Sequence, residues 1–374
     1  MLNQPLLLSH FLCAVCRLGC DNLKLNIKRL CVAIVAFSFF GFTLVACGFK
    51  AEEESIGEKE QLVFFSGGTL DDQVASVLLF TMEDVEILGT IVANTDCVGS
   101  FATQAQWKIQ SLISKSAFPI ALSEAKGWNP FPYAYRADSI SVYQMEIMQA
   151  HPENSDWPPF PSGNALLEEL LTQAVKDKKP ITLLITEPFT PLSDVLKANP
   201  ELEKGILRAI WMGGAIDVPG NLDPATIPSA MANGKAEWNA FWDPYAVDWI
   251  FKNTSFPLVV FPLDVTNQAG LSEDFLNKLE QQGSTYGYSK LAYDLYSTVS
   301  DEPYFEMWNT LTTVYVSRPD IFAEAVPMKL SIVREGFEQG SMIRDENGRT
   351  ANVVLDVADK EAFYEYVLAQ LRKN

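Results

Sequence analysis

Histidine is almost absent from this sequence. Among the 374 residues there are only His10 and His151. The first lies in an N-terminal leader, and the second lies in the stretch HPENSDWPPF, which is typical of a solvated loop. A histidine general base and a zinc site built from several histidines are therefore not expected. Acid–base chemistry in this protein would have to be carried by carboxylates.

Positive charge is scarce as well. The chain carries 28 Lys and Arg residues against 47 Asp and Glu residues, which gives a formal net charge of −19. Such an acidic surface repels phosphate backbones, and this argues against a nucleic-acid partner. Acidic side chains are, by contrast, suited to holding a hard cation.

The N-terminal region has the pattern of a secretion signal. Lys24, Lys28 and Arg29 precede an apolar run over residues 30–47 that ends in the letters LVAC. Small residues before a cysteine resemble a bacterial lipoprotein processing site, with Cys47 as the lipidated first residue of the mature chain. The alternative is a plain transmembrane anchor, because the run is nearly long enough to span a bilayer. We prefer the lipoprotein interpretation because the apolar run stops at the cysteine, and it predicts a protein anchored in the cell envelope on the periplasmic or extracellular face.

Beyond the leader the chain is poor in cysteine. If Cys47 carries a lipid, Cys97 is the only free thiol left in the mature chain, which excludes a disulfide framework. We therefore divide the chain into a signal and lipoprotein leader over 1–47, a flexible acidic tether over 48–60, and one folded domain over 61–374.

The domain alternates apolar runs with helical patterns. Most of the runs are continuously apolar, which indicates strands of a parallel sheet that is covered on both faces. The predicted strands cover 62–66, 86–94, 118–122, 181–186, 208–214 and 256–263, with two more within 328–336 and 350–357. The predicted helices cover 71–82, 100–115, 164–176, 243–252, 271–282, 304–317 and 359–372. The expected fold is an α/β domain with an open, mostly parallel sheet flanked by helices.

Two insertions interrupt this pattern. Residues 123–139 and 151–164 are rich in proline and aromatic residues. Such loops often form lids over a site, but ordinary well-packed surface loops have the same composition. The sequence leaves both interpretations open.

The stretch LVFFSGGTLDDQVASVLLF joins the first predicted strand to a helix and places Asp71 and Asp72 side by side. An acid at a helix N-terminus is explained by capping and by the helix dipole. Two acids after a glycine pair favour a ligand site at the carboxyl end of a strand, where open α/β sheets bind ligands. Polar groups also follow the other strands, at 94–97, 186–190, 212–221, 237–243 and 264–267. Because the carboxyl ends of parallel strands share one edge, these groups are expected to converge.

Several of these segments match known motifs in order and spacing. FSGGTLDD at 65–72 matches D-x-D-x-G-x-D-D in part, and EPFTP at 187–191 matches G-P-L-T-N loosely. MGGA at 212–215 with the later GN at 220–221 matches M-G-G-A and G-N, and EWNAFWDP at 237–244 matches E-F-N-x-x-x-D-P. WN at 308–309 stands where the motif has W/H-D. Over about residues 61–372 the sequence resembles the inosine–uridine nucleoside hydrolases.

The resemblance implies a nucleoside-hydrolase fold that binds a ribonucleoside over a Ca²⁺ ion. By position in the motifs, the metal would be held by Asp72, by the main-chain carbonyl of Thr190 and by Asn309. Oxygen ligands suit this hard cation. The metal would lower the pKa of a bound water, and a carboxylate would take its proton.

The same resemblance implies a set of residues around the substrate. Asp71 would take ribose hydroxyls at the catalytic centre together with Asn239. Asn221 and Glu237 would hold the far end of the sugar, and Trp308 would also contact the substrate. Departure of the base passes through an oxocarbenium-like state, which buried acids stabilise.

The sequence departs from the family at the metal. The acid that serves as metal ligand and general base in the family falls at Gly67, and the late metal-binding acid falls at Asn309. In compensation, an asparagine near the attacking water in the family aligns with Asp96, which is therefore the candidate replacement base. A site with fewer charges is expected to bind Ca²⁺ more weakly. Loss of a general base without replacement costs about 10²- to 10⁴-fold in rate.

We therefore predict a lipoprotein that hydrolyses the N-glycosidic bond of ribonucleosides or related N-ribosides. The alternatives are a catalytically degenerate lipoprotein that binds nucleoside or ribose, and the solute-binding lipoprotein of a transporter, for which two hinged lobes would be expected. The predicted partners are a small-molecule riboside and, through the lipid, a membrane, and a homo-oligomer is compatible with the sequence. Asp243 is predicted to be a helix cap and Asp264 a structural acid, and both are left out of the site.

Overall fold

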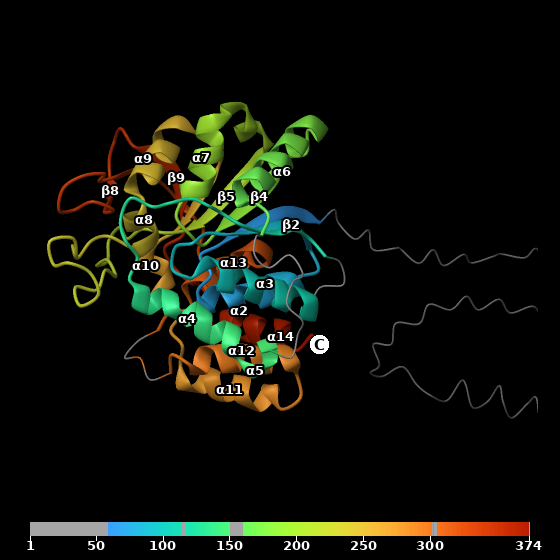
Figure 1. The fold of residues 1–374 in the computed structure, drawn as a ribbon. Helices are drawn as coiled ribbons and strands as arrows, with labels where there is room; N and C mark the ends of the chain where they lie inside the picture. The colour runs from blue at the N-terminus through green and yellow to red at the C-terminus, as the bar shows by residue number, and fades with distance from the viewer. Residues whose placement is uncertain (1–58, 114–116, 150–159, 301, 303–304, 374) are drawn as a thin grey trace, which may run out of the picture. The chain divides into compact units, whose positions relative to one another are not determined.

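The computed structural model describes residues 59–113, 117–149, 160–300, 302 and 305–373 (Figure 1). The leader with Cys47, nearly all of the tether and the His151 loop lie outside these ranges. Within the described part, no helix has both the length and the apolar character needed to cross a membrane.

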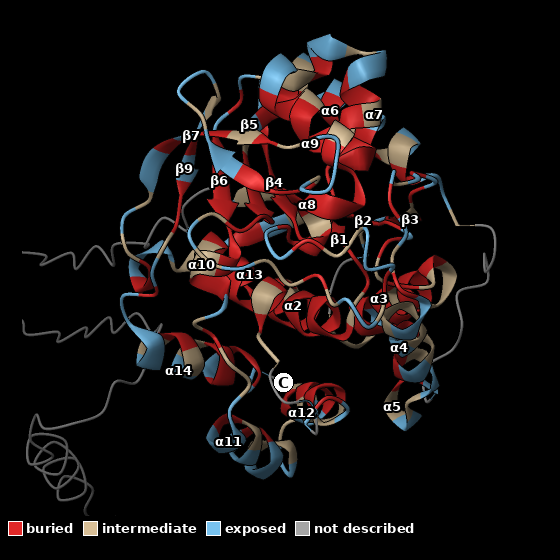
Figure 2. Cartoon of the chain, turned by 90° about the vertical axis from the view of Figure 1, so that its left-hand side faces the viewer, coloured by how far each residue is buried: buried red, intermediate tan, exposed pale blue. Residues whose placement is uncertain are grey.

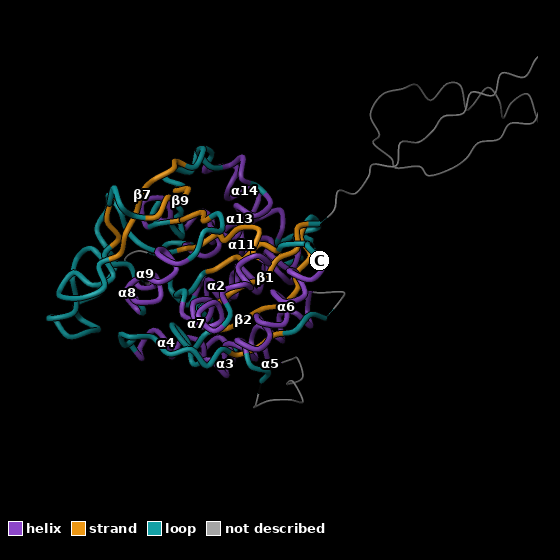
Figure 3. The backbone as a smooth tube through the Cα atoms, turned by 90° about the horizontal axis from the view of Figure 1, so that it is seen from above, coloured by secondary structure: helices purple, strands orange, loops and turns teal. Residues whose placement is uncertain are grey.

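The fold is an α/β domain around one nine-stranded sheet with the order β3-β2-β1-β4-β5-β6-β9-β7-β8. Every pair from β3 to β9 is parallel, and β7 pairs antiparallel with both β9 and β8. The strands are β1 Glu60–Ser66, β2 Val85–Val92, β3 Ile120–Leu122, β4 Ile181–Ile185, β5 Ile206–Met212, β6 Leu258–Phe261, β7 Val326–Ile332, β8 Met342–Arg344 and β9 Arg349–Val353. The predicted open, mostly parallel sheet is confirmed, and β7 and β9 lie at the opposite end of it from β2 (Figure 3).

Helices cover both faces of the sheet (Figure 2). On one face lie α6 Gly163–Asp177, α7 Thr190–Ala198 and α9 Pro244–Asn253. On the other face lie α2 Leu70–Thr81, α3 Gly99–Ile113, α11 Glu273–Gly283, α12 Gly287–Ser297, α13 Trp308–Ser317 and α14 Lys360–Gln370. The remaining helices are α4 Tyr133–Gln144, α5 Glu146–Gln149, α8 Trp238–Trp242 and α10 Leu263–Thr266, with 3-10 turns η1 Pro200–Gly205 and η2 Pro319–Ile321.

The two faces of the sheet have separate hydrophobic cores, and the side chains of β1 belong to both. Leu62 and Phe64 pack into the core shared with α2 and α13, whereas Val63 and Phe65 pack into the core shared with α6 and α7. Side chains alternate between the faces of a strand, so a strand covered on both sides must be apolar at every position. The central strands are thereby packed on both faces, and because they are parallel their carboxyl ends form one edge of the sheet.

The structure adds elements that the sequence patterns did not predict. Residues 123–139 are not one loop, because α4 begins at Tyr133 directly after Pro132. The helix α12 was missed, although Leu291, Ala292, Leu295 and Tyr296 are buried on one of its faces. The predicted helix 304–317 begins only at Trp308.

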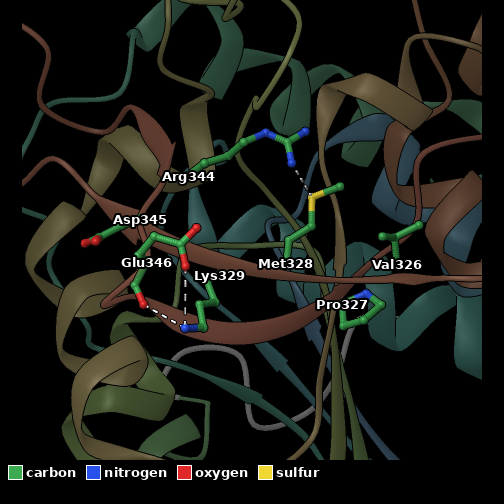
Figure 4. Close-up of a pocket in the computed structure, with 7 residues that line it drawn as sticks. All are labelled: Val326, Pro327, Met328, Lys329, Arg344, Asp345 and Glu346. Carbon is green, nitrogen blue, oxygen red and sulfur yellow. Dashed lines mark hydrogen bonds and ion pairs between the residues drawn. The ribbon is translucent and has the colours of Figure 1, made fainter.

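The sheet ends at the short edge strand β8, where three residues pair with β7. Figure 4 shows a pocket at this edge, lined by Val326, Pro327, Met328, Lys329, Arg344, Asp345 and Glu346. Lys329 Nζ donates to the main-chain oxygen of Glu346 at 2.9 Å. Charged side chains protect an edge strand from pairing with other chains. None of the predicted site residues lines this pocket.

Candidate active site

The two adjacent acids stand in the first turn of α2 and have different partners. Thr69 is the N-cap, and its hydroxyl accepts from the main-chain N–H of Asp72 at 3.1 Å. Asp72 Oδ2 in turn accepts from the main-chain N–H of Thr69 at 2.9 Å, which completes a capping box. The capping interpretation therefore holds for Asp72, but capping alone does not explain why both acids are buried.

Asp71 is directed toward the N-terminus of α13. Its Oδ1 accepts from the hydroxyls of Tyr296 and Thr310, both at 2.7 Å. Its Oδ2 accepts from the main-chain N–H groups of Asn309 at 2.6 Å and Thr310 at 3.3 Å. A carboxylate has about four acceptor positions, so protein donors occupy all of them in this conformation. Burial raises the pKa of Asp71, and the four hydrogen bonds oppose that effect. A ribose hydroxyl could bind Asp71 only by displacing one of these donors.

Asp72 links α2 to the end of β4. The hydroxyl of Thr186 donates to Asp72 Oδ1 at 2.5 Å, and the hydroxyl of Thr69 donates to Asp72 Oδ2 at 2.9 Å. Burial raises the pKa of Asp72 to about 7, with a further contribution from the charge of Asp71. These hydrogen bonds fix the position of the Asp72 carboxylate. Because burial disfavours its charge, the carboxylate is stabilised by binding a proton or by a cation beside it.

The residues from the later motifs join the same network. Glu237 is the N-cap of α8 and accepts from the main-chain N–H groups of Gly214 at 2.8 Å, Asn239 at 2.8 Å and Ala240 at 3.1 Å. Burial raises the pKa of Glu237 to about 7, against the effect of these bonds. The side-chain amide of Asn239 donates to the main-chain oxygens of Met212 at 3.0 Å and Thr186 at 3.5 Å. Hydrogen bonds therefore run from Asp72 through Thr186 to Asn239 and Glu237.

Asn221 lies beside this network. Its Oδ1 accepts from the main-chain N–H of Trp238 at 3.2 Å, and its main-chain N–H donates to Ala236 at 3.1 Å. Asn221 is thereby held next to Glu237. The ends of β1, β4 and β5 and the start of α8 thus bring Asp72, Asn221, Glu237 and Asn239 together.

Asp96 follows β2 and faces the same acids. Its Oδ1 is buried and has no hydrogen-bond partner. Burial raises the pKa of Asp96 well above its usual value, and the charges of Asp72, Asp138 and Glu237 raise it further, while Arg136 opposes them. Arg136 belongs to α4 and donates to the main-chain oxygen of Cys97 at 2.9 Å. The first insertion therefore packs over the loop that carries Asp96.

Three further predicted residues take separate positions. The hydroxyl of Thr190 donates to Asp243 at 2.9 Å, and the Thr190 carbonyl accepts from the hydroxyl of Ser193 at 3.1 Å. The side-chain amide of Asn309 donates to Thr69 Oγ1 at 3.5 Å, so Asn309 adjoins the Asp72 cap. Trp308 begins α13, and its Nε1 is buried without a hydrogen-bond partner.

Asp243 and Asp264 have the structural roles predicted for them. Asp243 is the N-cap of α9 and accepts from the main-chain N–H of Ala246 at 3.0 Å. Asp264 accepts from the main-chain N–H groups of Ile216 at 2.9 Å and Asp217 at 2.8 Å, so it fixes the loop after β5.

Gly67 leaves no side chain at the centre of the site. A Cβ added there would lie 3.2 Å from Asp72 Oδ2, 3.2 Å from the main-chain oxygen of Thr186 and 3.5 Å from Thr95 Oγ1. Position 67 therefore faces Asp72 directly, which is where the family motif has an acid.

Sequence reasoning did not assign Glu187, although this residue directly follows the apolar run ITLLIT. Glu187 is fully buried, its Oε2 accepts from the main-chain N–H of Ala93 at 3.0 Å, and its Oε1 has no partner. Burial raises the pKa of Glu187 well above its usual value, and the charge of Asp72 adds to this. An acid that directly follows a buried strand was the available signal.

The chemistry of the donors fits a hard cation. Asp96 and Glu187 each have a buried carboxylate oxygen that lacks a donor, and the charge of Asp72 raises the pKa of both acids. In the described part of the chain, however, no three His, Cys, Asp or Glu side chains form a group that could hold a metal ion. Main-chain and amide oxygens would have to complete the coordination, as they commonly do for Ca²⁺.

Known proteins match most of this chain. The family model described as inosine-uridine preferring nucleoside hydrolase matches residues 65–365. The pyrimidine-specific ribonucleoside hydrolase RihA of Klebsiella pneumoniae (strain 342) is 25% identical, over 80% of this chain and 94% of the relative. RihA of Shewanella oneidensis is 29% identical over 56% of this chain and 60% of the relative.

Solved structures share the fold. The inosine-uridine preferring nucleoside hydrolase from Bacillus anthracis has a TM-score of 0.76 and 28% identity, covering 84% of this chain and 100% of the other. The plant nucleoside hydrolase PpNRh1 has a TM-score of 0.71 at 16% identity, which shows the fold alone. Because the family model spans most of the sequence, this chain belongs to the inosine-uridine preferring nucleoside hydrolase family.

Proposed function

We propose that the protein hydrolyses the N-glycosidic bond of ribonucleosides or closely related N-ribosides. The observation that supports this most is the hydrogen-bonded network at the carboxyl edge of the sheet, which joins Asp72, Thr186, Asn239 and Glu237. Ligands of open α/β sheets bind at this edge. In the reaction the oxygen of a water attacks C1′ of the ribose and the C1′–N bond breaks. The products are ribose and the free base, which takes up a proton.

The proposed cofactor is Ca²⁺, in keeping with a family whose members usually bind a metal ion. Asp72, the carbonyl of Thr190 and the side-chain oxygen of Asn309 are the residues that would hold it. When bound, Ca²⁺ supplies Lewis acidity that lowers the pKa of a coordinated water.

The protein side chains carry the remaining steps. Asp96 is the proposed general base, because its unpartnered Oδ1 can accept a proton from the attacking water and the negative charge of Asp72 raises its proton affinity. Asn221, Glu237 and Asn239 are proposed to orient the sugar, and Glu237 can stabilise positive charge that develops on the ribose. Trp308 is proposed to contact the substrate. The role of Asp71 in ribose binding stays a prediction, since its acceptor positions are filled here.

The experiment is a hydrolysis assay with uridine, cytidine and inosine in the presence of Ca²⁺, with release of reducing sugar as the readout. Turnover of any of them that depends on Asp96 supports the proposal. Pyrimidine nucleosides are included because related RihA proteins are named as pyrimidine-specific.

A second candidate is a catalytically degenerate protein that binds nucleosides or ribose. Gly67 favours it, because no side chain stands there to serve as ligand or base. Calorimetric binding of ribose or a nucleoside by a protein without turnover would support it. The transporter alternative receives no such support, because the described residues build one continuous sheet and not two lobes.

We further propose that the chain is lipid-anchored through Cys47, which lies outside the described residues. The pattern of a basic region, an apolar run and LVAC supports this. Mass spectrometry of the mature N-terminus tests it, and an uncleaved chain or an unmodified Cys47 would refute it.

A further inference from the structure

We propose that Glu187 is a cation ligand that takes the place of the acid missing at Gly67. This inference rests on the proposed function, because the cation is the one proposed for that site. It assigns to Glu187 a role that the motifs do not predict, since the matching motif G-P-L-T-N has glycine at this position.

The register of the sheet places Glu187 beside Gly67. Phe65 on β1 pairs with Ile185 on β4, and the main-chain N–H of Thr186 donates to the carbonyl of Phe65 at 2.9 Å. Two residues further along each parallel chain, Gly67 and Glu187 leave their strands at the same level. The side chain of Glu187 can therefore reach the space that a side chain at position 67 would occupy.

The hydrogen bond of Glu187 shows how far its side chain extends. Glu187 Oε2 accepts from the main-chain N–H of Ala93, the residue that follows β2. Because β1 lies between β2 and β4, the side chain must pass the end of β1, where Gly67 stands, to make this contact. The carboxylate thus lies at the end of the strand whose own acid is missing.

The second oxygen of the carboxylate points to a ligand. Glu187 is fully buried, and Oε1 has no hydrogen-bond partner. A buried acceptor without a donor is destabilising, and the effect is larger for a charged group. An oxygen in this state, beside a second buried carboxylate, is suited to a cation.

The electrostatic environment agrees with this assignment. The hydroxyl of Thr186, the residue directly before Glu187, donates to Asp72 Oδ1 at 2.5 Å, which places the two acids in the same buried region. Burial, and after it the charge of Asp72, raises the pKa of Glu187 well above its usual value. Two adjacent buried acids cannot both be ionised at low cost unless a positive charge lies between them. The single acid of the family would then be replaced by two residues, with Glu187 binding the cation and Asp96 accepting the proton.

The test is the affinity of the purified full-length protein for calcium chloride, measured by isothermal titration calorimetry without substrate. Glu187→Gln keeps the size of the side chain and an acceptor for Ala93 but removes the charge. The matched control is Glu60→Gln, which makes the same change in an acid at the opposite end of β1 that pairs with Arg208 at 2.7 Å. Circular dichroism establishes that both variants are folded.

We expect Glu187→Gln to weaken Ca²⁺ binding by at least about tenfold and Glu60→Gln to leave it within about twofold of the parent. The double variant Gly67→Asp with Glu187→Gln should recover affinity relative to Glu187→Gln alone, because it returns an acid to position 67. Equal affinity of Glu187→Gln and the parent, or no binding by the parent, would overturn the proposal, as would a folded double variant that recovers nothing. Turnover is not a readout here, so a parent that binds Ca²⁺ but hydrolyses no nucleoside would remove the proposed activity and leave the Glu187 assignment standing.

Discussion

The main-chain N–H of Asn309 donates a hydrogen bond of 2.6 Å to the carboxylate of Asp71. This bond joins the first turn of α2 to the first turn of α13, two segments that lie 238 positions apart in the chain. An acid at a helix N-terminus is stabilised by the free N–H groups and by the dipole of that helix. Asp71 therefore accepts hydrogen bonds at the N-terminus of α13, although it belongs to the first turn of α2.

The first prediction concerns this contact. Asp71→Asn should destabilise the protein by roughly 2–4 kcal/mol, because the new NH₂ group cannot accept from the donors that now share the carboxylate. Urea denaturation of both proteins provides the measurement. If the variant has the stability of the parent but a raised KM for a ribonucleoside, Asp71 binds the substrate and does not stabilise the helix contact.

The second prediction concerns the turn before α2. Gly68 has a φ of 75°, and a Cβ there would lie 2.6 Å from Cys97 Sγ and 2.7 Å from Ala102 Cβ. Gly68→Ala should therefore cost at least about 1–3 kcal/mol from the backbone conformation alone, with overlap added. The matched control is Gly234→Ala, where an added Cβ would meet nothing within 4 Å. Thermal denaturation should separate the two variants clearly, and equal melting temperatures would contradict the argument.

The third prediction concerns stability and pH. Burial raises the pKa of Glu237 from 4.5 to about 7, so the folded protein holds this proton more tightly than the unfolded chain does. The stability that Glu237 contributes is therefore complete below pH 4.5 and is lost as the pH rises through about 7. The loss is on the order of 3 kcal/mol. Desolvation also raises the pKa values of Asp72, Asp96 and Glu187, so these acids act in the same direction.

The measurement is the free energy of unfolding between pH 5 and pH 8 in the presence of a chelator. Stability should fall with rising pH, and Glu237→Gln should flatten the slope. The slope is the readout because the substitution also alters the hydrogen bonds to Gly214, Asn239 and Ala240. A parent whose stability rises over this range would disprove the prediction.

The strand ends show how much of the site follows from sequence. The run at 62–65 predicts a strand covered on both faces, and Asp71-Asp72 predicts a helix start, because both depend only on neighbouring residues. The grouping of Asp72, Glu237 and Asn239 follows from one further rule, that parallel strands end at one edge. These inferences need no knowledge of side-chain direction.

Other features depend on contacts that no local pattern encodes. The donors to Asp71 come from Tyr296 and from the start of α13, and only the packing of α12 and α13 on α2 brings them there. The sequence places Glu187 directly after a strand, but the regular alternation of side-chain directions stops at that point. Its direction across β1 toward Ala93 could be learned only from the structure.

The last prediction concerns the general base. Asp96→Asn should lower kcat by about 10²- to 10⁴-fold, because it removes the unpartnered carboxylate oxygen that is proposed to take the proton of the attacking water. The matched control is Asp138→Asn, a solvent-exposed acid of α4 whose charge raises the pKa of Asp96. That variant should keep kcat within a few fold and should shift the acidic limb of the pH–rate profile to lower pH, since one repelling charge is gone. Both are assayed with the best nucleoside at saturating Ca²⁺. Parental activity that survives Asp96→Asn would rule out Asp96 as the base, and a parent that binds nucleoside without turning it over would favour the degenerate binding protein.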